Sequence, residues 1–431
     1  MLLPDTAERD AAGRLRIGGC DVAELAERHG TPLYVYDEAT LRARLRAYRR
    51  AVDAWPAGGE VLYSAKAFFG LAMAQLVVEE GCGVDVVSGG ELELAMRGGV
   101  PPARIGFPGN NKSAFEVLAA ASAGVGQLVV DSLRELDLVA ALRDTPTVRA
   151  LLRVSPGVDP DTHAYISTGQ LDSKFGFTVE DGSALRALKR ALAIPTLDLL
   201  GVHMHIGSQI VDLRSYALAI ERVTALLASA RASLGFTART LSVGGGLGIA
   251  HTDADDPPTV DELMSLVTRT VSASFSNNGL PAPALCVEPG RSVAGPAGVA
   301  VYSVGARKEI PGVRTYVSVD GGMADNLRPK LYSARYQPLP VVERRGGAPD
   351  EVVTLAGRYC ESTDILVDAA RLPRLHPGDL VALPAAGAYT LSMSSNYNAA
   401  ARPAVVFVRD GAARLVRRRE TLDDWLAAEV G

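Results

Sequence analysis

The sequence has few of the residues that build metal sites, disulfide frameworks and membrane spans. Its 431 residues include only six histidines and four cysteines. The cysteines lack the paired spacing of a zinc site or a disulfide framework, and they are Cys20, Cys82, Cys286 and Cys360. No stretch reaches the roughly 18 unbroken apolar residues of a membrane span. The first residues, MLLPDTAERD, lack the basic and then apolar order of a signal peptide, so the sequence predicts a cytoplasmic protein without a membrane partner.

An excess of charge of one sign is also lacking. Lys and Arg number 44 against 49 Asp and Glu, a net charge of -5, and no dense basic cluster stands out. This balance gives no electrostatic reason to expect nucleic-acid binding. A hydrophobic content of 48% with 22% charged residues is ordinary for a globular protein, whereas disorder needs fewer apolar residues. A chain of this length predicts two domains.

Short β-branched runs alternate with helical stretches from residue 60 to residue 290. One stretch carries Tyr216, Ile220, Val223, Leu227 and Ala230 on a single face, the spacing of an amphipathic helix. Such alternation predicts a parallel sheet, and eight strands in this length favour an α/β fold of the (β/α)8 TIM-like barrel type. A doubly wound open sheet is the alternative, but it usually has fewer strands and a glycine fingerprint after the first. The expected strands are Val61–Ser64, Val84–Val87, Arg104–Phe107, Leu128–Asp131, Val148–Val154, Leu197–His205, Thr240–Val243 and Leu285–Glu288.

After Gly290 the pattern changes to strands with little helix between them. We therefore expect a barrel domain over 36–295 and a mainly β domain formed by 296–431 together with 1–35. Leu33–Tyr36 is expected to be a strand that leads into the barrel. The expected strands of the β domain are Val299–Val304, Arg314–Asp320, Glu351–Gly357, Asp379–Leu383, Ala404–Arg409 and Ala413–Arg417.

Polar side chains follow nearly every expected barrel strand, where the functional groups of such barrels collect. Lys66 ends an apolar strand, and an amine at a buried strand end can act as a nucleophile that forms a Schiff base. The alternative is a lysine that only extends its ammonium to water. The other strand-end groups are Asp85, Ser88, Asn110, Asp131, Arg153, His203, His205, Gly244–Gly246, Glu288 and Arg291.

The residues after the seventh expected strand could bind a phosphate, and those after the eighth could bind a pyridine ring. The glycine run Ser242–Gly248 follows the seventh strand, where backbone N–H groups of a barrel often bind phosphate, although glycine-rich turns are common. Glu288 and Arg291 follow the eighth strand. A carboxylate there can keep a pyridine nitrogen protonated, which makes the ring a stronger electron sink. The alternative is a surface ion pair of little energetic value.

His203 and His205 alternate on one expected strand, a spacing that also suits metal ligands. A zinc hydrolase would need further ligands at other strand ends, and the remaining histidines do not lie there: His29, His163, His251 and His376. We therefore expect no metal and favour an imidazole that stacks on a flat cofactor.

The motifs VLYSAKAF, VDVVSGGEL, FPGNNKS, SKFGF, HIGSQI, GGGLGI, EPGR, DGGMADNLRP, YCES and SMSSNYN occur in this order. From about Leu33 to Val405 the chain thereby resembles the alanine-racemase-like, fold-type III pyridoxal-phosphate enzymes, and among them the diaminopimelate decarboxylases. The resemblance implies a (β/α)8 barrel with a β-sandwich domain, the cofactor pyridoxal 5'-phosphate, and a homodimer with active sites at the subunit interface. The implied reaction is decarboxylation of meso-2,6-diaminopimelate at its D-centre to L-lysine and CO2, the last step of lysine biosynthesis.

The resemblance also implies a role for each matching residue. Lys66 would be the catalytic lysine that carries the cofactor, and Cys360, entering from the other subunit, the acid that protonates the substrate carbon. The other implied cofactor contacts are Asp85, His205, Ser208, Gly246, Glu288, Gly290, Arg291 and Tyr389. The implied substrate contacts are Arg291, Arg328, Tyr332, Glu361 and Tyr389.

The charges of the implied substrate contacts agree with such a substrate. A distal carboxylate and a distal ammonium need cationic fork-shaped donors together with an acid, which two arginines and Glu361 supply. A decarboxylase for ornithine or lysine would want a carboxylate in place of Arg328. Two positions depart from the family pattern: Thr363 replaces the usual Gly after the CES motif, and Phe68 stands where Asn is frequent.

These departures leave alternatives open. One is a related decarboxylase of secondary metabolism that acts on another free or carrier-tethered amino acid. A non-catalytic relative and a metal-dependent barrel hydrolase are the others.

Overall fold

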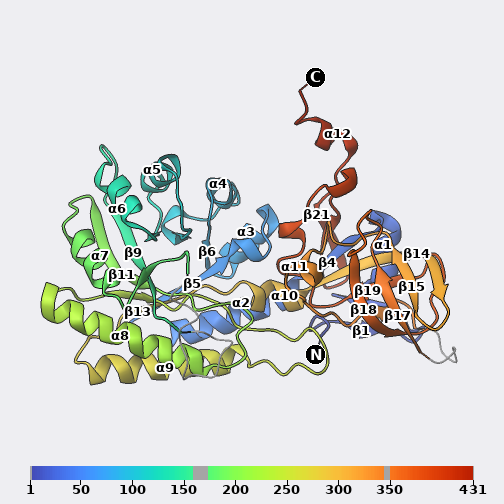
Figure 1. The fold of residues 1–431 in the computed structure, drawn as a ribbon, viewed down its shortest axis with the longest axis horizontal. Helices are drawn as coiled ribbons and strands as arrows, with labels where there is room; N and C mark the ends of the chain where they lie inside the picture. Colours follow the sequence, from blue (N-terminus) through green and yellow to red (C-terminus); the bar gives the residue numbers. More distant parts are fainter. Residues whose placement is uncertain (1, 159–172, 344–349, 431) are drawn as a thin grey trace. The chain divides into compact units, whose positions relative to one another are not determined.

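The computed structural model describes residues 2–158, 173–343 and 350–430. The chain forms two compact units (Figure 1). The barrel unit comprises Arg44–Gly248 and Pro258–Ser292, and the β unit comprises Met1–Ala43, Ile249–Pro257 and Val293–Gly431. The short segment Ile249–Pro257, which no sequence pattern singled out, thus belongs with the β unit.

Within the described residues, eight parallel strands close into a barrel, which confirms the predicted fold. β8 pairs with β9 and β13 with β5, so the ring has no free edge. A short strand β10 (Phe177–Thr178) adds to β9 outside the ring. The barrel strands are β5 (Gly59–Ser64), β6 (Gly83–Asp85), β7 (Ile105–Phe107), β8 (Gln127–Val130), β9 (Val148–Ser155), β11 (Leu197–His203), β12 (Thr240–Ser242) and β13 (Ala284–Val287).

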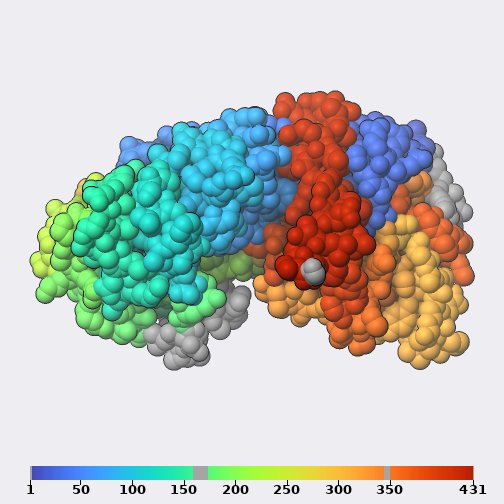
Figure 2. Space-filling model, turned by 90° about the horizontal axis from the view of Figure 1, so that it is seen from above, coloured from blue at the N-terminus to red at the C-terminus, as the bar shows by residue number. Residues whose placement is uncertain are grey.

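The helices that follow β6, β7 and β8 each begin after an N-cap serine. The hydroxyl of this serine accepts a hydrogen bond from the backbone N–H three residues later. The three serines are Ser88, Ser113 and Ser132. Such caps satisfy backbone donors that the first helical turn leaves unpaired, so each strand passes into its helix through a short loop. The segments coloured light blue to teal, which contain α3 to α6, form a continuous outer layer (Figure 2). The helices are α2 (Glu38–Asp53), α3 (Leu71–Glu79), α4 (Gly89–Arg97), α5 (Ala114–Ala123), α6 (Leu133–Ala140), α7 (Ser183–Leu192), α8 (Arg214–Leu234), α9 (Val260–Asn277) and α10 (Arg291–Ala297), with 3-10 turns η1 (Ala65–Ala67) and η2 (Pro102–Arg104).

The β unit is built on a sheet of order β18-β17-β15-β14-β4-β20-β21, with β19 and β16 joined to β14. Its core consists of the inward residues of β4, β14 and β20 together with small N-terminal elements. The elements are β1 (Glu8–Arg9), β2 (Leu15–Ile17), β3 (Cys20–Asp21), α1 (Val22–His29), β4 (Leu33–Asp37), β14 (Gly298–Ile310), β15 (Arg314–Val319), α11 (Arg328–Leu331), β16 (Leu339–Pro340), β17 (Glu351–Ala356), β18 (Ile365–Leu372), β19 (Leu380–Leu383), η3 (Leu391–Met393), η4 (Tyr397–Ala399), β20 (Ala404–Arg409), β21 (Ala412–Arg417) and α12 (Leu422–Leu426).

The strand expected at Leu33–Tyr36 is present and belongs to the β unit. This segment is β4, a central strand of the β unit that pairs antiparallel with β14 and parallel with β20. All its residues are buried, because both edges and both faces are covered, and a strand of that kind has a continuous apolar run instead of an alternating one. In the part of the chain that the structure describes, no helix is long and apolar enough to cross a membrane.

Candidate active site at the mouth of the barrel

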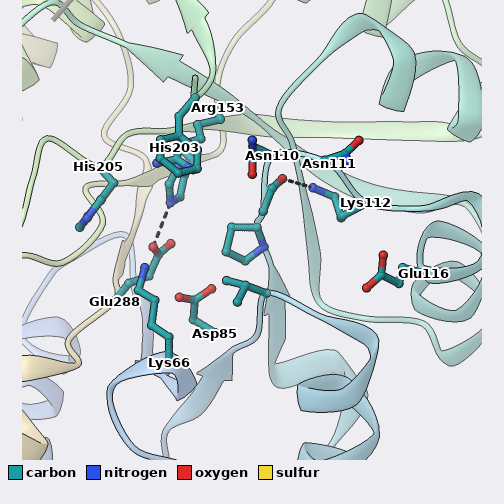
Figure 3. A pocket seen from close by; sticks show the side chains of 14 residues that line it. Lys66, Asp85, Asn110, Asn111, Lys112, Glu116, Arg153, His203, His205 and Glu288 are labelled. Carbon is teal, nitrogen blue, oxygen red and sulfur yellow. Dashed lines mark hydrogen bonds and ion pairs between the residues drawn. The ribbon is translucent and has the colours of Figure 1, made fainter. Parts of the chain in front are cut away.

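A cavity of about 430 Å³ lies at the C-terminal ends of the barrel strands. Figure 3 shows Lys66, Asp85, His203 and Glu288 directed toward one another on one side of it. The loop after β7 supplies residues of the opposite wall, among them Asn110, Asn111 and Lys112 (Figure 3). The lining residues are Lys66, Asp85, Val87, Pro108, Gly109, Asn110, Asn111, Lys112, Glu116, Arg153, Phe175, His203, His205 and Glu288.

Lys66 lies in the 3-10 turn that directly follows β5, so its side chain is anchored next to the barrel wall. The turn packs against Gly290, where an added Cβ would lie 2.9 Å from the Ser64 Cβ and 3.1 Å from the Ala67 Cβ. Such contacts are too close for a side chain at residue 290. The glycine therefore lets the EPGR turn approach the turn that carries Lys66.

Asp85 is buried beside this lysine turn and accepts a hydrogen bond of 2.7 Å from the Ser64 hydroxyl. Burial, followed by the nearby charge of Glu288, raises the pKa of Asp85 to about 7. Its Oδ1 atom is buried and has no hydrogen-bond partner among the described residues. Asp85 is thus a carboxyl group that can gain or lose a proton near neutral pH, with one oxygen available to a ligand.

Glu288 follows β13 and receives two buried hydrogen bonds. His203 Nε2 lies 2.9 Å from its Oε2 (Figure 3), and the Ser242 hydroxyl donates to its Oε1 at 2.7 Å. Burial alone would raise the pKa of Glu288, but His203 and Ser242 outweigh it and lower the pKa to about 2. Glu288 is therefore an ionised carboxylate at neutral pH.

His205 lines the same cavity, and the backbone N–H of Gly245 donates to its Nδ1 at 3.3 Å. Burial, with the positive charges of Lys66 and Arg153, lowers the pKa of His205 to about 3. The ring is therefore neutral at physiological pH. A neutral, flat imidazole suits stacking on an aromatic ring, the role that the resemblance implies.

The predicted phosphate-binding residues of the barrel unit come together. Arg291 donates to the Ser208 hydroxyl at 2.9 Å. Gly246 has a φ of +116°, and an added Cβ would lie 2.4 Å from the Gly207 carbonyl oxygen, so only glycine fits against that turn. Ser208, Gly246 and Arg291, from three successive strand exits, thus form one polar corner.

Sequence reasoning missed a second buried network on the opposite wall. Lys112 and Glu135 form an ion pair, and Glu135 also accepts the backbone N–H of Asp131 at 2.8 Å. Asp131 in turn pairs with Arg153 and accepts the Gly176 N–H at 2.7 Å. The Arg153 guanidinium lies 4.1 Å from the centre of the Phe175 ring. The motifs FPGNNKS and SKFGF each contain residues of this network. The sequence does not show that the two motifs are connected through Glu135, Asp131 and Arg153.

The remaining predicted site residues lie in the β unit. Arg328 is buried and donates to the Tyr336 hydroxyl at 2.8 Å, so it is not an ordinary surface arginine. Tyr332 and Cys360 are exposed. The Glu361 carboxylate lies 3.1 Å from both the backbone nitrogen and the hydroxyl of Thr363, which lower its pKa. The side chain that departs from the family pattern therefore contacts a predicted substrate residue.

The last predicted residue of the β unit is Tyr389, which has a φ of +57°. Among the described residues, no group of three or more His, Cys, Asp or Glu side chains could hold a metal ion. His163 lies outside the described residues.

The donor set of the cavity fits pyridoxal phosphate. The cavity combines an amine, an ionised carboxylate for a ring nitrogen and a neutral flat imidazole. The polar corner with Arg291 lies at the exits of β11, β12 and β13, from which His205 and Glu288 also come. The unpartnered Asp85 Oδ1 adds a buried polar atom that a ligand could satisfy.

Comparison with known proteins agrees with this chemistry. The family model for the pyridoxal-dependent decarboxylases, pyridoxal binding domain, matches residues 38–295, more than half of the chain. Together with the barrel and its lysine, this match defines a pyridoxal-dependent decarboxylase, a class of carbon–carbon lyases.

Full-length relatives narrow the class. Diaminopimelate decarboxylase of Bacillus subtilis (strain 168) is 46% identical over 98% of this chain and 97% of its own. That of Mycobacterium tuberculosis (strain ATCC 25618 / H37Rv) is 44% identical over 99% and 97%. A crystal structure of diaminopimelate decarboxylase from M. jannaschii with L-lysine has a TM-score of 0.93 and 36% identity, covering 100% of this chain and 99% of that one. The chain belongs to the diaminopimelate decarboxylase family.

Proposed function

We propose that this chain catalyses the pyridoxal-phosphate-dependent decarboxylation of meso-2,6-diaminopimelate at its D-centre, giving L-lysine and CO2. The observation that carries the proposal is one cavity, lined by the Lys66 amine and the ionised Glu288 carboxylate, in a chain that is similar over its full length to diaminopimelate decarboxylases. The predicted place of this reaction is the last step of lysine biosynthesis.

Lys66 would hold the cofactor through its amine, and Glu288 would pair with the ring nitrogen. His205 would lie against the ring face, and the corner of Ser208, Gly246, Gly290 and Arg291 would bind the phosphate, with Tyr389. When bound, pyridoxal phosphate supplies an electron sink for the pair that remains when a carboxylate leaves as CO2. The ionised Glu288 favours a protonated ring, and the protonated ring is the stronger sink.

The substrate carbon that loses CO2 must then receive one proton. We assign this proton to the Cys360 thiol of the partner subunit in a homodimer, because a thiol can give a proton near neutral pH. Glu361 would bind the distal ammonium, and Arg291, Arg328 and Tyr332 the distal carboxylate. A free thiol at Cys360 agrees with the cytoplasmic location that the sequence predicts.

Substrate-dependent release of CO2 tests the proposal. The pyridoxal-phosphate-loaded protein should release CO2 from meso-diaminopimelate and only poorly from D-lysine, D-ornithine and D-glutamate. The product of the first reaction should be L-lysine by chiral chromatography. Activity restricted to a substrate without a distal carboxylate would contradict the roles of Arg328 and Tyr332. Activity on another free or carrier-tethered amino acid would instead favour a relative of secondary metabolism.

A further inference from the structure

His203 has a buried contact that its place in the sequence did not reveal. Its Nε2 atom lies 2.9 Å from Glu288 Oε2, and the His203 side chain is 2% exposed and that of Glu288 7%. Ser242 Oγ lies 2.7 Å from the other carboxylate oxygen. His203 and Ser242 are register partners on neighbouring strands, so their donors approach Glu288 from the same level of the barrel.

The surroundings of His203 identify which nitrogen carries its hydrogen. Nδ1 is buried and has no hydrogen-bond partner among the described residues. A hydrogen on Nδ1 would therefore be a buried donor without an acceptor, which is costly. The neutral tautomer with hydrogen on Nε2 avoids this cost and donates to Glu288. A protonated Glu288 that donates to His203 is disfavoured, because Ser242 also donates to the carboxylate and hydrogen bonds of this kind favour its charged form.

These two donors affect how a proton is shared between Glu288 and a base. A carboxylate that accepts two buried hydrogen bonds is a weaker base than one without them. A proton between this carboxylate and a pyridine nitrogen therefore stays on the nitrogen. Without the His203 donor the carboxylate becomes more basic and draws the proton toward itself.

We propose that His203 is a positioning residue that donates from Nε2 to Glu288, so that the proton shared with the cofactor ring nitrogen stays on the ring. This inference rests on the proposed role of Glu288. It assigns the first histidine of the HMH triplet a task distinct from that of His205, which would contact the ring face. The proposed effect of His203 on the ring nitrogen passes through Glu288.

Other charged and titratable groups near Glu288 also affect its pKa. His205 shares β11's exit with His203, and burial keeps its ring neutral. Asp85 carries a negative charge when ionised, which would oppose the ionised form of Glu288, whereas cations favour that form. The groups that line the cavity with Glu288 are Lys66, Asp85, Lys112, Glu116, Arg153, His203 and His205.

Two substitutions separate hydrogen bonding from packing. His203→Gln keeps an N–H donor near the position of Nε2, whereas His203→Leu keeps bulk and removes the donor. His376→Leu, at an exposed position of the β unit, is the matched control. Thermal unfolding of all three proteins reports whether the fold is retained.

The first measurement uses cofactor-free protein with ¹³C-carboxyl-labelled glutamate, the Glu288 signal being assigned with Glu288→Gln. His203→Leu should raise the pKa of Glu288 by about one to two pH units, while His203→Gln and His376→Leu should change it by less than about half a unit. In wild type, ¹⁵N NMR should show His203 as the neutral Nε2–H tautomer. An unchanged Glu288 titration in folded His203→Leu would overturn the proposal.

The second measurement uses enzyme loaded with ring-¹⁵N-labelled pyridoxal phosphate. The ring-nitrogen signal should indicate a protonated ring in wild type and a shift toward the unprotonated form in His203→Leu, with recovery in His203→Gln. kcat should fall about tenfold in His203→Leu, with KM changed less than about twofold. If wild type binds no cofactor, the proposed function fails, but the cofactor-free titration still decides the His203 contact. If wild type binds cofactor and His203→Leu leaves the ring nitrogen unchanged, only this inference fails.

Discussion

Lys112 and Glu135 form an ion pair inside the barrel unit, with Nζ and Oε2 3.0 Å apart and each side chain 1% exposed. The ammonium also donates to the carbonyl oxygens of Gly109 and Val129, both at 2.7 Å. The pair therefore fixes the loop after β7, which forms one wall of the cavity, to the end of β8. Both the ammonium and the carboxylate make further hydrogen bonds to the backbone, which offset the cost of burying their charges.

Removal of one charge should lower the free energy of unfolding more than removal of both charges. Lys112→Met leaves the Glu135 charge buried and should lower the free energy of unfolding by about 3–5 kcal/mol in urea. The double variant Lys112→Met/Glu135→Gln removes both charges and keeps an amide oxygen for the buried backbone N–H groups of Lys112 and Asp131, so it should recover part of that loss. Arg97→Met, which breaks the exposed Arg97–Glu93 pair, is the control and should cost less than about 1 kcal/mol. Equal losses in the single and double variants would contradict the uncompensated-charge explanation.

Lys66→Ala should abolish the long-wavelength absorbance of the bound cofactor, because no amine would remain at that position to bond its aldehyde. Activity should fall on the order of 1,000-fold or more. Lys189→Ala, on the exposed face of α7, should leave both properties unchanged. Retention of the absorbance band in folded Lys66→Ala would show that another amine carries the cofactor.

Asp85 should make the stability of the cofactor-free protein depend on pH. Its pKa rises on folding from 3.8 to about 7, so between these values the native state holds a proton that the unfolded chain has released. The stabilisation is present below the unfolded pKa and is lost as pH rises through about 7. Asp85→Asn cannot titrate, so its free energy of unfolding should fall less between pH 5 and pH 8, by about 1 kcal/mol or more. Urea titrations at both pH values measure this difference, and parallel curves for the two proteins would refute it.

The barrel was predictable because each strand is an apolar run bounded by loops and helices. Boundaries of the barrel strands differ by at most two residues, as at the expected Leu197–His205, which ends as a strand at His203. Strand β18 was missed because the run of Ile365–Leu372 is interrupted by Asp368 and Arg371, whose side chains stay at the surface. An exposed edge strand of this kind has no continuous apolar signal.

Several residues that line the cavity could be predicted one by one from the strand ends, but the contacts between them could not. Lys66 and Glu288 follow strands, which a sequence can show. The His203–Glu288 hydrogen bond joins residues 85 positions apart, and nothing local marks it. Alignment of the ends of successive strands would have found it, because His203, Ser242 and Glu288 follow one another around the ring. Register and tertiary proximity are the information that the linear pattern lacks.

Asp364 should control the loop that carries Cys360. Its carboxylate accepts the Met323 N–H at 2.7 Å and the Tyr359 N–H at 2.9 Å, so it joins two loops of the β unit. Asp364→Asn replaces one acceptor oxygen by an NH2 donor. This change should lower the free energy of unfolding by about 1–3 kcal/mol. Cys360 is the one exposed cysteine among the described residues, so iodoacetamide labelling followed by mass spectrometry reports on this loop.

Labelling of Cys360 should be at least about twofold faster in Asp364→Asn, because the loop opens more often. Asp368→Asn is the matched control, since its exposed carboxylate pairs with Arg314 at the surface. If both variants label at the wild-type rate, Asp364 does not restrain the loop.

Arg328 offers a test of substrate recognition that separates binding from folding. Arg328→Lys keeps a charge but loses the planar fork, and Arg328→Met loses both. Each lost charge-assisted hydrogen bond to a carboxylate costs about 1.5–3 kcal/mol, so kcat/KM for meso-diaminopimelate should fall about 10- to 100-fold in Arg328→Met. D-lysine has no distal carboxylate, so its slow decarboxylation should change less than about threefold. Arg371→Met, on an exposed part of β18, should affect neither substrate. An equal loss for both substrates would mean that Arg328 serves only its buried contact with Tyr336, and the distal carboxylate would then need another partner.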